Sequence, residues 1–107
     1  MEIRGTNQLK EVVKNQEYLI DYGTIEQGSD TTVVIDILDV DHLSISKSCG
    51  CTQPTVEIRP EGIQIKVSYD NNKLGTINQR VTERCTEKSS GEQKTIIFNL
   101  KGNITQK

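Results

Sequence analysis

Several residue types are absent or nearly absent from this sequence, and each absence excludes a class of protein. Among 107 residues there is no Ala and no Trp, and only one Phe, one Met and one His. The missing Ala removes the strongest helix former, and the missing Trp excludes the Cys–Trp–Cys signature of antibody domains. No apolar run exceeds three residues, whereas a membrane-spanning helix needs about 20, so we expect no membrane span.

The sequence also lacks an excess of charge of either sign. The 13 basic and 15 acidic residues are interspersed, giving a formal net charge of −2. Without a basic block or basic residues interleaved with aromatic ones, we expect no direct nucleic-acid partner. The eight glycines are spread one to a turn and form no phosphate-cradling loop, so no cofactor is predicted. No basic segment followed by an apolar stretch opens the chain, which predicts either a cytoplasmic protein or a leader already removed.

β-branched residues dominate what is present. Thirteen Ile, eight Val and eleven Thr make 32 residues that fit a pleated surface well. The clearest alternation is over residues 62–69, where Ile63, Ile65, Val67 and Tyr69 share one face. Seven segments are predicted as strands: residues 18–22, 31–38, 43–48, 55–58, 62–69, 76–85 and 94–101.

Turn-forming residues separate these segments at intervals typical of a two-sheet fold. We therefore predict an all-β protein, an immunoglobulin-like antiparallel β-sandwich of about seven strands. The sandwich domain is predicted over residues 17–107, and residues 1–16 are predicted to form an N-terminal arm.

The arm has its own apolar pattern. Ile3 is isolated, while Leu9, Val12 and Val13 have the spacing of one helical turn and predict an arm or short helix. Such a helix is too short to be stable alone. We therefore predict that these four residues dock on a protein partner.

Cys49, Cys51 and Cys85 are the only cysteines. Strand parity puts Cys49 and Cys51 on one face and Cys85 in line with Ile77 and Val81, so all three thiols are expected in or near the core. A zinc site would need a second matched ligand pair, which is missing, so no metal is predicted. A disulfide from Cys85 to Cys49 or Cys51 stays open, but buried, reduced thiols are favoured.

The single His42 is predicted to be a solvated turn residue, because neither a nucleophile motif nor an orienting group accompanies it. With no catalytic residue to name and no small-molecule substrate expected, the sequence predicts a protein that is not an enzyme.

Five segments, in this order, form a recognisable pattern: Asp21–Gly28, Ser48–Thr52, Arg59–Asp70, Leu74–Thr76 and Leu100–Ile104. Together they resemble the bacterial domain of unknown function numbered fifteen-seventy-three, with Ser-Cys-Gly-Cys-Thr at 48–52 as the most specific element. The resemblance implies a short immunoglobulin-like sandwich related to cilium- and centrosome-associated modules. It also implies an exported protein without established activity, although Asp39-Val40-Asp41 replaces the family's Asn-x-Gly turn and the expected lipoprotein-type leader is missing.

Two functions are compatible with this sequence. The first is an accessory or decoration protein of a bacteriophage capsid or similar multicopy assembly, located in the virion and in the host cytoplasm during assembly. Small size, a docking arm and the missing leader favour it. The alternative is a periplasmic or envelope binding module in which the Cys-Gly-Cys loop stabilises the fold or senses redox state. In both cases the expected partner is another protein.

Overall fold

The computed structural model describes residues 2–5 and 17–107, together with the backbone of residues 9–13. In this part of the chain every regular element is a strand. The strands are β1 (Glu2–Gly5), β2 (Leu9–Val13), β3 (Glu17–Glu26), β4 (Val33–Leu38), β5 (Val40–Lys47), β6 (Thr52–Arg59), β7 (Gly62–Tyr69), β8 (Gly75–Glu87) and β9 (Gln93–Thr105). All seven predicted strands are present, most of them longer than predicted.

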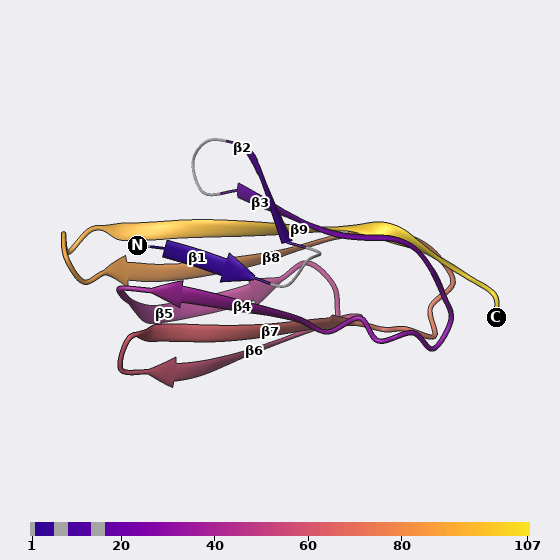
Figure 1. Cartoon of the computed structure of the whole chain (residues 1–107), viewed down its shortest axis with the longest axis horizontal. Helices are drawn as coiled ribbons and strands as arrows, with labels where there is room; N and C mark the ends of the chain where they lie inside the picture. The colour runs from indigo at the N-terminus through magenta and orange to yellow at the C-terminus, as the bar shows by residue number, and fades with distance from the viewer. Residues whose placement is uncertain (1, 6–8, 14–16) are drawn as a thin grey trace.

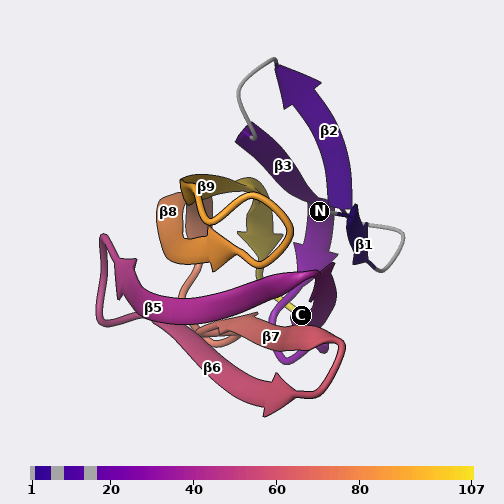
Figure 2. The ribbon, with the colours of Figure 1, turned by 90° about the vertical axis from the view of Figure 1, so that its left-hand side faces the viewer.

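Two sheets form the molecule, as Figures 1 and 2 show. One has four strands in the order β1-β4-β7-β6, and the other has five in the order β2-β3-β9-β8-β5. The two sheets pack face to face, so β4, β7 and β6 oppose β9, β8 and β5. That division is the B-E-D and G-F-C arrangement of the immunoglobulin sandwich, which confirms the predicted fold class.

One strand pairing differs from the prediction. β3 runs parallel to β9, with Glu17 opposite Ile97 and Glu26 opposite Thr105, so the five-stranded sheet is mixed and not wholly antiparallel. The β3 register shifts between Asp21 and Thr24, around Gly23, which has a φ of 64°. The pairing of β3 with β9 leaves no local pattern in the sequence, because the paired residues, such as 17 and 97, are far apart along the chain.

The core lies between the sheets and is built from the alternating residues. On β4, Val33, Ile35 and Ile37 are fully buried, and on β9 the same is true of Ile96, Phe98 and Leu100. Alternation thus identified one face of each strand correctly. The remaining buried apolar residues are Ile20, Tyr22, Val40, Ile63, Ile65, Val67, Tyr69, Ile77, Val81, Cys85 and Ile104.

The N-terminal segment contributes one strand to each sheet. β1 pairs with β4, where Ile3 lies opposite Ile37, is half-buried and packs against the core of its own chain. Residues 9–13 form a strand antiparallel to β3, so the predicted helical turn is wrong. A five-residue helix has almost no stability of its own, whereas the edge of β3 offers ladder hydrogen bonds. The side chains of Leu9, Val12 and Val13 lie outside the described residues.

Candidate binding site at the loop end of the sandwich

Backbone hydrogen bonds tie three connections together at one end of the sandwich, which we call the loop end. The Gly28 amide in the β3–β4 connection donates to the Asn71 carbonyl, and the Asp70 amide donates to the Cys51 carbonyl, both at 2.8 Å. The β5–β6 and β7–β8 connections are therefore fixed to one another. The opposite end, which we call the turn end, holds the β4–β5, β6–β7 and β8–β9 connections (Figure 1). There the Lys88 amide donates to the Asp39 carbonyl, and the Asp39 amide donates to the Glu61 carbonyl.

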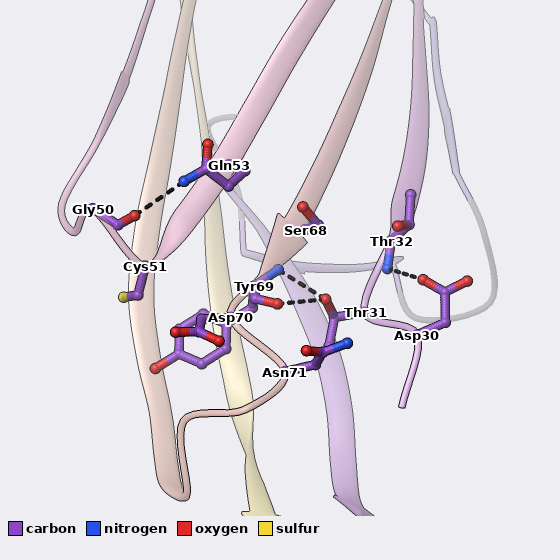
Figure 3. Close-up of a pocket in the computed structure, with 10 residues that line it drawn as sticks. All are labelled: Asp30, Thr31, Thr32, Gly50, Cys51, Gln53, Ser68, Tyr69, Asp70 and Asn71. Atoms are coloured by element: carbon purple, nitrogen blue, oxygen red, sulfur yellow. Dashed lines mark hydrogen bonds between the residues drawn. The ribbon is translucent and has the colours of Figure 1, made fainter. Parts of the chain in front are cut away.

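A hollow of about 360 Å³ opens between these three connections at the loop end. In Figure 3, Gly50, Cys51 and Gln53 line one side of it, and Asp30 and Thr32 lie on the other. The full lining is Asp30, Thr31, Thr32, Gly50, Cys51, Gln53, Ser68, Tyr69, Asp70 and Asn71. Backbone hydrogen bonds link the connections that frame this hollow.

Thr31 is the buried residue that fixes one wall of the hollow. Its hydroxyl donates to the Tyr69 carbonyl at 2.7 Å and accepts from the Tyr69 amide at 2.9 Å. Its carbonyl accepts from the Tyr22 hydroxyl at 2.8 Å. Burial, with a smaller contribution from Asp30, raises the pKa of Tyr22, so its hydroxyl stays a neutral donor. The sequence offered no reason to select Thr31 among eleven threonines.

The charge in the lining is of one sign. Asp30 and Asp70 are the ionisable carboxyl groups of the lining, and none of the ten residues is Lys, Arg or His. The Asp30 carboxylate accepts from the Thr32 amide at 2.9 Å, and this bond lowers its pKa. The Asp70 carboxylate accepts from the Asn72 amide at 3.0 Å. The hollow thus presents two carboxyl groups beside hydroxyl and amide groups, a surface suited to a polar partner.

Cys49 and Cys51 form a disulfide bond next to the hollow, with Cα atoms 5.2 Å apart. The favoured prediction of reduced thiols is therefore wrong for this pair. The chain turns at Gly50, which brings the two side chains together, and the Cys51 amide also donates to Cys49 Sγ at 3.1 Å. The amide of Thr52, the first residue of β6, donates a hydrogen bond to the Cys49 carbonyl.

Cys85 stays reduced and buried, as predicted, but it does not meet the other two cysteines. It pairs in register with His42 on β5, seven residues before Cys49, which corresponds to roughly 20 Å of strand. Burial first, and the charge of Glu83 second, raise the pKa of Cys85 to about 11, so its thiol is protonated at neutral pH. Within the described residues, no group of three His, Cys, Asp or Glu is arranged to hold a metal ion.

His42 lies on β5 beside a buried carboxylate, so its prediction as a solvated turn residue is wrong. Its Nδ1 is 2.7 Å from Oε2 of Glu83, and the Glu83 side chain is fully buried. Among the described residues, Glu83 Oε1 has no hydrogen-bond partner. Burial raises the pKa of Glu83, and the His42 hydrogen bond opposes the shift. Sequence reasoning missed Glu83, although it shares the parity of Val81 and Cys85 on β8.

The disulfide closes a loop of only three residues, so we expect it to stabilise the fold modestly. Replacing both cysteines (C49S/C51S) should lower the free energy of unfolding by about 1–2 kcal/mol. Urea denaturation with and without reductant measures this. Reductant should lower the wild-type value to that of the variant and leave the variant unchanged. If reductant leaves the free energy of unfolding of the wild type unchanged, the disulfide does not stabilise the fold as predicted.

No family model matches this chain, and no curated protein matches it. The resemblance to the bacterial domain of unknown function numbered fifteen-seventy-three stays a prediction that depends on the five quoted segments. Across the described residues, no helical segment has the length and apolar character of a membrane span.

Proposed function

We propose that this chain is a non-enzymatic interaction module that binds a protein partner through the loop end of its sandwich. The observation that carries the proposal is the hollow of about 360 Å³ framed by three connections, of which β7–β8 is hydrogen-bonded to each of the other two. A preformed concave surface on loops supported by a rigid sandwich is a common location for binding in this architecture.

The polar groups of the chain suit binding better than chemistry. The Cys85 thiol is buried and keeps its proton at neutral pH, and His42 is hydrogen-bonded to Glu83. The hollow itself holds carboxylates, hydroxyls and amides, with Asp30 and Asp70 as its charged groups. Groups of this kind position a partner through hydrogen bonds and charge.

Two settings fit the module. The first is a bacteriophage capsid or similar multicopy assembly, in which the chain is an accessory or decoration protein. The second is the bacterial envelope or periplasm, where it binds a protein on its own. The Cys49–Cys51 disulfide favours an oxidising environment, which the envelope and the surface of a released virion both provide.

The proposal is tested by placing a photo-cross-linking amino acid at Gln53, which is exposed and lines the hollow. Irradiation of cells in which the chain is made at its natural level should give one predominant adduct with a discrete protein other than a second copy of this chain. The matched control is the same amino acid at Glu92, an exposed position in the β8–β9 turn.

The expected result is an adduct from Gln53 and little or none from Glu92. The triple variant D30N/N71A/D70N, which removes lining groups while leaving Thr31 in place, should weaken the Gln53 adduct. Equal adducts from both ends, or none from Gln53, would overturn the loop end as the binding surface.

A further inference from the structure

Each sheet has two edge strands, and these four edges differ in how well they are protected against pairing with another strand. β1 is only four residues long. β2 and β5 each carry a register shift, between Glu11 and Val13 and between His42 and Ser44. Short strands and bulges are the usual devices that prevent edge pairing. β6 has neither, because its eight residues pair with β7 in one unbroken register from Thr52 to Arg59, although Pro54 removes one amide from its edge.

The backbone groups on the outer side of β6 can be assigned from its hairpin. Pro60 and Glu61 form a two-residue turn that Arg59 and Gly62 close as a register pair. In such a hairpin the closing pair is hydrogen-bonded, and the bonding alternates along the strand. Arg59 and every second residue before it therefore bond to β7. Val56 and Ile58 direct their amides and carbonyls outward, and Pro54 directs its carbonyl outward.

Ile58 adds an apolar side chain to this edge. It shares the parity of Thr52 and Val56, which face the other sheet, yet 67% of its surface is exposed. β6 lies at the outer limit of its sheet in Figures 1 and 2, and within the described residues no strand pairs with its outer side. A core-facing Ile is thus left uncovered beside unpaired backbone groups.

We propose that β6 pairs antiparallel with β6 of a second copy of this chain, joining two four-stranded sheets into one of eight strands. The register we infer places Val56 opposite Val56 of the second copy. The Val56 amide and carbonyl then exchange two hydrogen bonds with their counterparts. Each Ile58 amide donates to the Pro54 carbonyl of the second copy, and this pair makes one hydrogen bond instead of two, because Pro54 has no amide to donate to the Ile58 carbonyl.

Side-chain chemistry selects both the second copy and this register. With Val56 at the two-fold axis, Glu57 faces Thr55 of the second copy and Arg59 faces Gln53, so no like charges meet. Ile58 is covered by Pro54 and Val56 of the second copy. Shifting the axis to Glu57 keeps four backbone bonds but sets the two Glu57 carboxylates directly opposite each other, which is unfavourable.

Sedimentation velocity over a concentration series tests the proposal. We expect reversible dimers with a dissociation constant of about 1–100 µM. I58K places an ammonium group where Pro54 and Val56 of the second copy cover Ile58, and it should raise the dissociation constant at least tenfold. L43K on the β5 edge is the matched control, because Leu43 is also exposed (48%), and it should leave the dimer unchanged.

Cysteine cross-linking tests the register, since Cys49 and Cys51 are bonded to each other and Cys85 is buried. Under mild oxidation, V56C should form a disulfide-linked dimer and E57C should form little. Circular dichroism of each variant confirms that the sandwich is folded. A wild-type chain that stays monomeric up to about 1 mM, a dimer insensitive to I58K, or a dimer cross-linked by E57C in preference to V56C would overturn the proposal.

Discussion

Replacing His42 with Ala should lower the free energy of unfolding by about 3 kcal/mol at pH 7.5, one of the two largest effects we expect. His42 provides the hydrogen bond to the fully buried Glu83 carboxyl group, whose other oxygen has no partner in the part of the chain that the structure describes. Removing the imidazole leaves a carboxylate in the core without compensation. Urea denaturation of both proteins between pH 5 and pH 8 measures the loss.

The pH dependence has a defined sign. Burial raises the pKa of Glu83 in the folded protein above its ordinary value of 4.5. A carboxyl group of this kind favours the folded state while it is protonated, and its contribution is lost as the pH rises through its folded pKa. The cost of H42A should therefore shrink toward pH 5, where more of Glu83 is neutral.

The matched variant is E83Q, which keeps a polar group beside His42 and removes the charge. Its free energy of unfolding at pH 7.5 should equal or exceed that of the wild type, and its pH dependence should be weaker. If E83Q costs as much as H42A, or if H42A costs the same at pH 5 and pH 8, then the buried charge is not the source of the effect.

Gly62→Ala should destabilise the fold by about 3 kcal/mol or more, because the position has no room for a side chain. A Cβ at Gly62 would lie 2.0 Å from the carbonyl oxygen of Ile37 and 2.9 Å from Cα of Leu38, both backbone atoms. Gly62 begins β7 and is paired with Leu38 on one side and Arg59 on the other. Relief of the clash would require separating β4 from β7, the centre of the four-stranded sheet.

Gly91→Ala separates steric overlap from backbone strain. Gly91 has a φ of 74°, but a Cβ there would meet nothing within 4 Å. Its substitution should cost only about 1 kcal/mol, the strain of a non-Gly residue in the left-handed region. Thermal and urea denaturation of both variants provide the comparison. Equal losses for the two variants would contradict the close approach at Gly62.

The fold was predictable because alternation is a local signal. Ile63, Ile65, Val67 and Tyr69 show their buried face directly in the sequence, and the turn residues place the ends of β7. The β3–β9 parallel pairing was not predictable, because register between distant strands depends on packing of the whole sandwich. The strand at residues 9–13 was missed since three apolar residues fit a helical turn as well as an edge strand.

The candidate site was only partly predictable. Cys49 and Cys51 drew attention by their spacing, but a bond across one Gly depends on the turn geometry that the chain adopts there. Glu83 was overlooked because a charged residue in a strand is normally assigned to the wet face. Its partner, His42, is 41 positions earlier in the sequence, on a strand that becomes its neighbour only after folding.

The central claim is that this chain is an interaction module whose loop end contacts a protein partner. The most direct measurement uses cells that carry the photo-cross-linking amino acid at Gln53. After irradiation, their lysate is separated on a sedimentation gradient, and the adduct in each fraction is identified by mass spectrometry. We predict one discrete Gln53 adduct, in fast-sedimenting nuclease-resistant particles for the capsid setting or in slow envelope-derived fractions for the alternative. If no fraction contains a Gln53 adduct, the claim is contradicted.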